Sequence, residues 1–215
     1  MVGIIRNVDM ANIFYPDFEC WIYVHKETVP NNVIQELWKR KNVRVIFKSG
    51  DLLSTKPMMW RFESIDDPDV EINMSRDCDT VILLREKLAV VQWIESGKPF
   101  HIMRDHPHHN MAIMGGMFGT RKNPKIPSWN AHMKNVPQYN ASYMYDQVFL
   151  QQIVYPIVRD DAMIHTSFVK GDGENCLNFP TDFDDYCNFV GQYIYEDGRQ
   201  NMDNTAQIRN AIGRK

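Results

Sequence analysis

Strand-like and helix-like segments alternate through the first half of the chain, with short connections between them. Residues 19–25 (ECWIYVH) and 43–50 (VRVIFKSG) are rich in aromatic and β-branched side chains, which indicates strands. Residues 30–42, which begin with proline and end in a basic cluster, predict a helix between the two strands. Strands joined by short helical connections pair in parallel through right-handed crossovers. The alternation therefore predicts an α/β fold.

The pattern continues into the middle of the chain. Residues 70–75 (VEINMS) alternate apolar and polar side chains, and residues 100–105 (FHIMRD) indicate a further strand. Between them lies the clearest helix, residues 82–97, and its expected apolar face carries Leu84, Leu88, Val91 and Ile94. The second half is less regular. We expect a helix over residues 146–159 that is interrupted at Pro156, loops over 169–185, and a polar segment after Asp197 that frays or leads into a linker.

Composition excludes several classes of protein. The 215 residues are 44% hydrophobic and 24% charged, which suits one globular domain of ordinary size. The net charge of −3 argues against binding to nucleic acid or to an anionic membrane surface. No apolar run approaches the ~18 residues that span a bilayer. The four cysteines are far apart, so they indicate neither a zinc knuckle nor a disulfide framework, and a reducing cytosol fits best.

The segment SRDCDT places Asp77 and Asp79 directly after the strand of residues 70–75 and before the clearest helix. Ligands gather at the carboxyl ends of strands in α/β sheets, and Mg²⁺ and Mn²⁺ prefer carboxylate and phosphate oxygens. A pair of aspartates is by itself a weak signal. The alternative is an ordinary strand-ending turn in which Asp79 or Thr80 caps the following helix. In either case Cys78 is expected to point away from the carboxylates into packing.

Three further positions carry candidate chemistry. Asp105 and His106 follow another strand and could hydrogen-bond a hydroxyl group or act as a base, whereas the adjacent His108 and His109 suit a solvated turn. An arginine in an apolar stretch, Arg61, requires an anion.

The anion beside Arg61 is either a phosphate or a nearby carboxylate, Asp66 or Asp67. The glycines of MGGMFG, Gly115 and Gly116, allow close approach of the backbone to a ligand, although a tight turn explains them equally well. The segment is neither a dinucleotide fingerprint nor a P-loop.

Two more segments complete the set of candidates. Asp146 and Gln147 stand at the start of the helix of residues 146–159, where Asp146 also suits the helix dipole. His165 follows a short apolar segment, and a lone histidine in that position is more often structural than a ligand.

Taken in order, WRF, RDCDT with REKLAVVQWIESG, FHIMRDHPHH, GGMFG, YDQVFL and FVGQ resemble the GT-A-type glycosyltransferases of large DNA viruses and microbes. Within that family they resemble the N-terminal domain of a multidomain glycosyltransferase that chloroviruses encode. The resemblance covers roughly residues 5–195. It implies one GT-A-like α/β domain over residues 1–197, with a mostly parallel mixed central sheet flanked by helices. Residues 198–215 would be a polar tail or the start of a linker.

The resemblance implies a metal-dependent glycosyltransferase that moves a hexose or deoxyhexose from a UDP-sugar, such as UDP-glucose, to a glycan acceptor, with retention slightly favoured. The cofactor would be Mn²⁺ or Mg²⁺. The implied metal ligands are Asp77, Asp79 and, more loosely, His165. The implied donor-binding residues are Arg61, Asp77, Asp79, Gly115 and Gly116, and the implied catalytic residues are Asp105, His106, Asp146 and Gln147.

The sequence departs from the family pattern at several positions. Cys78 stands where a small residue is usual, Phe118 where tryptophan is common, and Gln192 where glutamate is common. The first strand, which normally helps to hold uracil, would be residues 3–7. The expected setting is the host cytoplasm, with no nucleic acid, no membrane span and further domains in a longer parent chain.

Two other classes of function stay open at this stage. A metal-dependent nucleotidyltransferase or phosphodiesterase would also use paired aspartates, but it requires a second carboxylate cluster for a second metal ion. A non-catalytic carbohydrate-binding domain requires an aromatic platform for the sugar.

Overall fold

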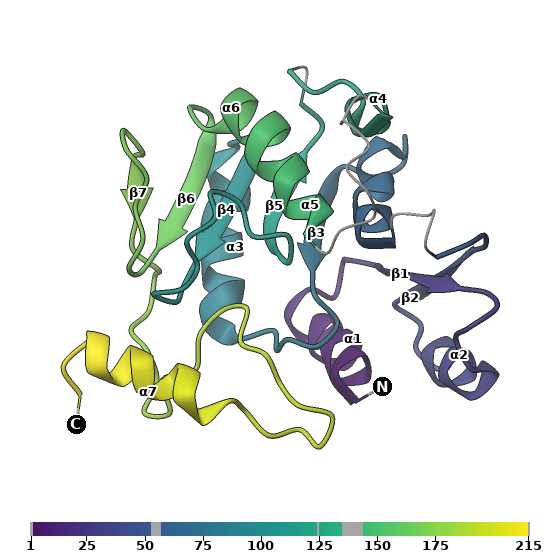
Figure 1. The fold of residues 1–215 in the computed structure, drawn as a ribbon, viewed down its shortest axis with the longest axis horizontal. Coiled ribbons are helices and arrows are strands. Elements are labelled where there is room, and N and C mark those ends of the chain that lie inside the picture. Colours follow the sequence, from purple (N-terminus) through teal and green to yellow (C-terminus); the bar gives the residue numbers. More distant parts are fainter. Residues whose placement is uncertain (1, 53–56, 124, 135–143, 215) are drawn as a thin grey trace.

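The computed structural model describes residues 2–52, 57–123, 125–134 and 144–214. Its centre is a five-stranded mixed sheet flanked by helices (Figure 1). The strands, in spatial order, are β3 (Ile72–Arg76), β5 (Met117–Arg121), β4 (Phe100–Arg104), β6 (Ala162–Thr166) and β7 (Cys176–Leu177). β5 runs antiparallel to both of its neighbours, whereas β4, β6 and β7 are mutually parallel. The α/β class predicted from the alternation is confirmed.

The first two strands form a separate sheet. β1 (Cys20–His25) pairs in parallel with β2 (Val43–Lys48), and α2 (Asn31–Trp38) connects them. Within the described residues, β1 and β3 each pair with one strand only, so each has a free edge. The mixed sheet flanked by helices was expected. Within the described residues, however, β1 and β2 lie outside it, so the expected single sheet is divided in two, and β5 is antiparallel to both of its neighbours. β5 was not expected to be a strand, because its pairing with β3 and β4 depends on partners distant in the sequence.

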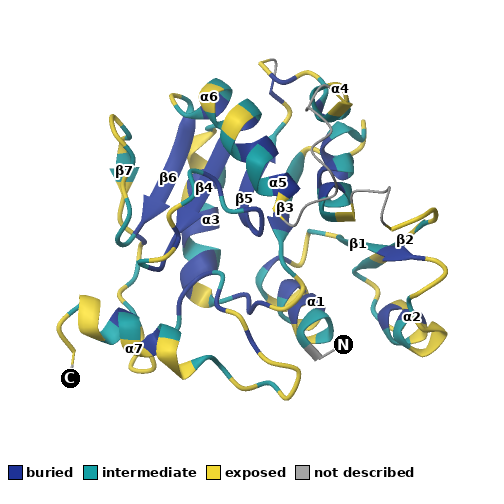
Figure 2. Cartoon of the chain, in the orientation of Figure 1, coloured by how far each residue is buried: buried dark blue, intermediate teal, exposed yellow. Residues whose placement is uncertain are grey.

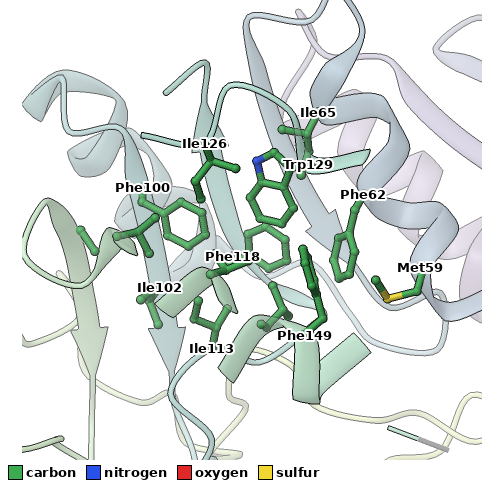
Figure 3. Close-up of a cluster of buried hydrophobic side chains, with 14 of the residues drawn as sticks. Met59, Phe62, Ile65, Phe100, Ile102, Ile113, Phe118, Ile126, Trp129 and Phe149 are labelled. Atoms are coloured by element: carbon green, nitrogen blue, oxygen red, sulfur yellow. The ribbon is translucent and has the colours of Figure 1, made fainter. Parts of the chain in front are cut away.

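Each face of the five-stranded sheet has its own core, as the strand periodicity requires. On one face, Phe100, Ile102 and Phe118 pack against helical segments that follow β5 and against the 3₁₀ helix η1 (Pro57–Asp66) (Figure 3). Those segments are α4 (Trp129–Lys134), α5 (Tyr145–Phe149), the π-helical η2 (Leu150–Val154) and α6 (Tyr155–Val158). On the other face, Met103 and Met117 pack against α1 (Val2–Phe14) and α3 (Leu84–Ser96).

The clearest predicted helix is confirmed as α3, and Gly97 ends it with a φ of 70°. Its buried face is not the one that we predicted, because Leu84 is exposed while Arg85 and Glu86 are buried. The two charged side chains are buried because each is neutralised. Glu86 accepts a hydrogen bond of 2.6 Å from the Arg76 guanidinium, and Arg85 pairs with a carboxylate at the end of β4. Apolar periodicity cannot anticipate a buried face that holds ion pairs.

The helix predicted over residues 146–159 is present, but its irregularity precedes Pro156. A π-helical turn occupies Leu150–Val154 and runs directly into α6, which contains Pro156.

Both ends of the chain are helical, whereas a strand was expected over residues 3–7 and a polar tail or linker over residues 198–215. Residues 3–7 lie in α1 rather than in a strand, because Val8, Ala11 and Tyr15 recur at helical spacing and are buried against the sheet. The segment after Asp197 forms α7 (Met202–Ala211), which the side chain of Asn201 caps and which buries Ile208. Among the described residues no helix is both long and apolar enough to cross a membrane. Figure 2 shows that exposure concentrates on the outer helices and loops.

Candidate functional site

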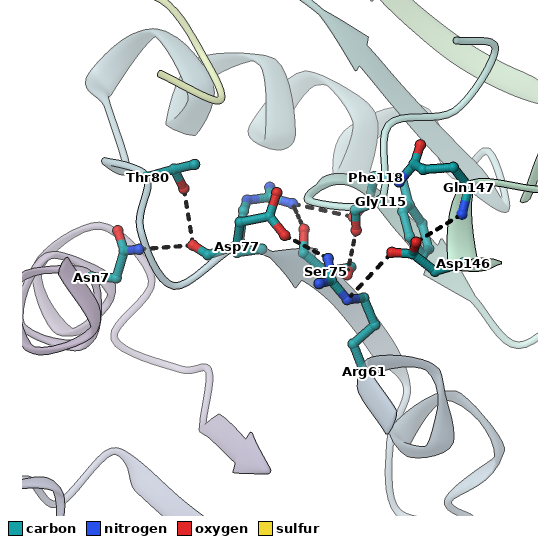
Figure 4. A network of polar contacts seen from close by, with 10 residues as sticks. Asn7, Arg61, Ser75, Asp77, Thr80, Gly115, Phe118, Asp146 and Gln147 are labelled. Carbon is teal, nitrogen blue, oxygen red and sulfur yellow. Dashed lines mark hydrogen bonds and ion pairs between the residues drawn. The ribbon is translucent and has the colours of Figure 1, made fainter. Parts of the chain in front are cut away.

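The turn that follows β3 is held by hydrogen bonds to the main chain of Asp77. Its carbonyl oxygen accepts from the Asn7 amide on α1 at 3.0 Å and from the Thr80 hydroxyl at 3.0 Å (Figure 4). α3 begins at Leu84 with Leu83 in the capping position and without a side-chain cap. The helix-capping role considered for Asp79 and Thr80 is therefore not observed.

Arg61 lies between two carboxylates from different parts of the chain. Its Nη1 donates to Asp77 Oδ1 at 2.6 Å, and its Nε lies 4.0 Å from Asp146 Oδ2. The carboxylate considered as its ordinary partner, Asp66, instead accepts from the main-chain N–H groups of Trp129 and Asn130 at the start of α4. Burial raises the pKa of the Asp146 carboxyl, and the Arg61 charge opposes that shift. The structure thus brings Arg61, Asp77 and Asp146 together.

The glycine turn before β5 completes this cluster. The Ser75 hydroxyl donates to the Gly115 carbonyl at 2.7 Å, and the Gln147 side-chain amide, turned to satisfy both partners, donates to Ile113 and accepts from the Gly115 N–H. A Cβ atom at Gly115 would overlap the Gln147 amide, and one at Gly116 would overlap the Asp77 carboxylate. Both glycines are therefore required by close packing of the backbone against the candidate side chains.

Asp79 and Cys78 are both exposed at the tip of the turn. Partial desolvation, and then the neighbouring charge of Asp77, raise the pKa of the Asp79 carboxyl. The expectation that Cys78 points into packing was wrong, because this residue lines a cavity beside Asp77. Across the described parts of the chain, no three His, Cys, Asp or Glu residues group as metal ligands. Two carboxylates do not form a complete metal cage, although carboxylate oxygens are the donors that hard cations such as Mg²⁺ prefer.

The cavity has a volume of about 540 Å³ and lies between α1, the free edge of β1, η1 and the free edge of β3. This volume is within the range of about 300–1,000 Å³ that is usual for small-molecule sites. Arg61, Asp77 and Cys78 line it together with the aromatic residues Trp21 and Tyr23.

Two carboxamide oxygens beside this cavity are buried and lack a hydrogen-bond partner in the described structure. They are Asn7 Oδ1 and Asn73 Oδ1, both from residues that line the cavity. The amide nitrogens of the same side chains are engaged, Asn7 with the Asp77 carbonyl and Asn73 with the Ser64 hydroxyl at 2.7 Å. A buried acceptor without a donor costs about 1–3 kcal/mol. Both oxygens are enclosed by protein, so neither is open to a ligand in the cavity.

The Asp105 side chain lies outside the cluster of Arg61, Asp77 and Asp146. Its carboxylate is fully buried and accepts from Arg85 at 2.8 and 3.0 Å, from the Val190 N–H at 2.9 Å and from the Ser167 hydroxyl. None of these partners lines the cavity beside Asp77. Asp105 does follow a strand, as expected, but its carboxylate oxygens accept hydrogen bonds that connect α3 to the loops after β6. This environment does not suit a base that must reach an acceptor.

His106 is directed away from the cluster in the same manner. Its Nε2 lies 3.2 Å from the Asn204 carbonyl, its Nδ1 accepts from the His108 N–H at 3.1 Å, and its ring packs on Phe189. His109, which was expected in a solvated turn, is buried, and its Nδ1 accepts from the main-chain N–H of Asp105.

His165 lies within β6 in the core. Its Nδ1 is 2.8 Å from His101 Nε2, and its Nε2 is 2.8 Å from Gln92 Oε1, so both ring nitrogens are engaged. Burial lowers the pKa of His165 to about 4 and that of His109 to about 3, and it lowers the pKa of His101 as well. The implied third metal ligand therefore does not join Asp77 and Asp79.

Because His101, His109 and His165 are buried, we expect the folded protein to lose stability in mild acid. Their pKa values are lowered in the folded state, so below the ordinary value of about 6.5 only the unfolded chain gains protons. Their contribution is complete above that pH and declines as the pH falls. Between pH 7 and about 5.5, we expect the free energy of unfolding to fall by roughly 1 kcal/mol for each histidine. Urea unfolding at both pH values measures this, and an unchanged midpoint would show that the imidazoles are accessible to protonation.

Sequence reasoning missed several residues of this region. Asn7, Trp21, Tyr23 and Asn73 line the cavity, and none was singled out beforehand. The alternation of Trp21 and Tyr23 along one strand was a usable signal, because side chains two residues apart share one side of a strand. Asn7 offered no such signal, because residues 3–7 were expected to form a strand rather than part of α1.

No family model, curated protein or solved structure matches the chain. The geometry of the site therefore carries the functional argument.

Proposed function

We propose that the protein is a metal-dependent glycosyltransferase of the GT-A type, which transfers a hexose or deoxyhexose from a UDP-sugar to a glycan acceptor. The observation that carries this proposal is the position of Arg61 and the Asp77–Asp79 turn at a cavity whose volume suits a small-molecule ligand. Cations and carboxylates side by side suit a diphosphate with its metal ion. Aromatic rings and amide acceptors suit a nucleoside.

The nucleoside would bind between α1 and the free edges of β1 and β3. Asn7 and Asn73 line this part of the cavity. Uracil presents an imide N–H and ribose presents hydroxyl groups, which carboxamide side chains can bind. Trp21 and Tyr23 offer apolar surface for the base. The free edges of β1 and β3 add main-chain N–H and C=O groups.

The donor diphosphate would lie against Arg61 and the aspartate turn. Asp79 is the exposed carboxylate and is our choice for direct coordination, whereas Asp77 is partly engaged by Arg61 and suits a ribose hydroxyl or the outer metal shell. Bound Mn²⁺ or Mg²⁺ would supply charge stabilisation for the departing nucleotide diphosphate. Arg61 would contribute a fixed positive charge to the same group.

Asp146 and Gln147 would face the donor sugar. Both converge on Gly115, and Asp146 shares Arg61 with Asp77. A retaining enzyme requires a group that stabilises an oxocarbenium-like sugar. Asp146 provides a carboxylate for that purpose, and the proposal therefore favours retention. Asp105, His106 and His165 have no part in it, because their contacts lie in the core.

Calorimetric titration of UDP with and without Mn²⁺ tests the proposal. We expect binding to strengthen at least about tenfold with Mn²⁺, since the metal ion joins the phosphates to the aspartates. UDP binding that is absent or indifferent to Mn²⁺ contradicts the proposal. Tighter binding of nucleoside triphosphates with two metal ions would favour a nucleotidyltransferase.

A carbohydrate-binding domain is the second candidate, and one observation favours it. Tyr193 and Tyr195 form an exposed aromatic pair on a turn next to Asp79. An aromatic platform is what such a domain requires. The same surface also suits an enzyme that must hold a glycan beside its donor.

A further inference from the structure

We infer that the hairpin of residues 193–200 is a saccharide-binding subsite that holds the glycan acceptor. Its role as an acceptor site rests on the proposed function, whereas its ability to bind a saccharide does not. The hairpin follows β7 in the chain, precedes α7, and lies among the largely exposed loops of Figure 2.

Main-chain hydrogen bonds make the hairpin a defined structure. The Tyr195 N–H donates to the Arg199 carbonyl at 2.9 Å, and the Gly198 N–H donates to the Tyr195 carbonyl at 2.8 Å. Gly198 has a φ of 83°, which a tight turn requires and which other residues rarely adopt. Ile194 forms an antiparallel bridge with Gln200. A preorganised turn loses little entropy when a ligand binds.

The side chains along this segment alternate between interior and solvent. Val190, Gln192 and Ile194 are buried, whereas Tyr193 and Tyr195 are 39% and 42% exposed. Residues two apart on an extended segment share one side, so both tyrosines are presented outward. Their ring centroids are 5.2 Å apart with an interplanar angle of 88°. Burying the other side of the segment fixes this pair in place.

The chemistry of the surface matches a saccharide. The tyrosines line an open depression of about 690 Å³ together with four polar residues, namely Glu196, Asp197, Arg199 and Gln200. Sugar rings combine weakly apolar C–H faces, which pack on aromatic rings, with hydroxyl groups that both donate and accept hydrogen bonds. Carboxylates, a guanidinium and an amide supply both kinds of partner.

The depression is connected directly to the aspartate turn. The Ile194 N–H donates to the Asp79 carbonyl at 2.9 Å, and Tyr193 forms an antiparallel bridge with Thr80. Two hydrogen-bonded segments lie about 5 Å apart. A saccharide on the tyrosines would therefore lie next to the residues that we assign to the donor, where an acceptor is needed.

Saturation-transfer NMR with a panel of methyl pyranosides of common hexoses, pentoses and deoxyhexoses tests the inference. We expect saturation transfer to at least one of them, and at least about tenfold weaker binding to the Y193A/Y195A double variant. Tyr186 is 71% exposed and lies off the hairpin, so Tyr186→Ala is the matched control and should bind as the wild type does. Mn²⁺-dependent UDP binding should persist in all three proteins.

The saccharide subsite and the glycosyltransferase proposal can be contradicted separately. If the wild type binds no pyranoside, or if the double variant binds as well as the wild type, the subsite assignment is overturned. If saccharide binding depends on the tyrosines but UDP does not bind, the subsite stands and the glycosyltransferase proposal fails.

Discussion

Replacing Asp79 with alanine should reduce Mn²⁺-dependent UDP binding at least about tenfold. The expected size follows from the loss of the exposed carboxylate that we assign to direct coordination, since even weaker disturbances around a metal site cost 10–100-fold in affinity. UDP binding measured without Mn²⁺ should change little, because Arg61 and the cavity remain. Calorimetry on the wild type and the variant, each with and without Mn²⁺, measures the effect.

The matched control for this experiment is Asp160→Ala. The Asp160 side chain is 87% exposed, and its ion-pair partner among the described residues is Arg159, at 3.6 Å. The Asp160→Ala substitution should leave UDP binding unchanged both with and without Mn²⁺. If Asp79→Ala binds UDP with wild-type affinity in Mn²⁺, the aspartate turn does not hold the cation.

Replacing Asp105 with alanine should destabilise the protein by about 3–5 kcal/mol. The substitution leaves the Arg85 guanidinium buried without its carboxylate, and removing one member of a buried pair typically costs this much. For a chain of this length, the loss corresponds to a fall in melting temperature of roughly 10 °C. Thermal and urea unfolding both measure the change.

Asp161→Ala is the control for that prediction. Asp161 pairs with Lys125 on the surface, and such pairs contribute about 0–1 kcal/mol. Its variant should therefore melt close to the wild type. If Asp105→Ala keeps wild-type stability but loses sugar transfer, Asp105 is a catalytic base, as the family resemblance implied, and our structural assignment is incorrect.

Much of the fold followed from local sequence patterns. β1, β2, β3 and β4 each have an apolar or alternating pattern that indicates a strand without reference to the rest of the chain. The division of the sheet and the insertion of β5 did not follow, because strand order depends on pairings between distant segments. The buried face of α3 was also misassigned, since the partners that neutralise Arg85 and Glu86 come from other elements.

The candidate site was predictable to a similar degree. The position of Asp77 at the end of β3 agrees with the expectation from the strand pattern. Asp105 occupies the equivalent position after β4, yet its side chain is consumed by Arg85, Ser167 and the Val190 N–H. The end of a strand indicates where a residue lies, but only its non-local partners determine whether its side chain is free for chemistry.

Identifying the nucleotide that is released from UDP-sugars tests most directly the proposal that the protein is a glycosyltransferase. The protein is incubated with Mn²⁺ and a panel of UDP-hexoses and UDP-deoxyhexoses that includes UDP-glucose, and the nucleotides are separated by anion-exchange chromatography. Without an acceptor, water should slowly take its place, so that the bond between the sugar and the diphosphate breaks and UDP and free sugar accumulate. We predict UDP from at least one donor and none without a divalent cation. Release of UMP with sugar 1-phosphate, or no change in any donor, would contradict the account.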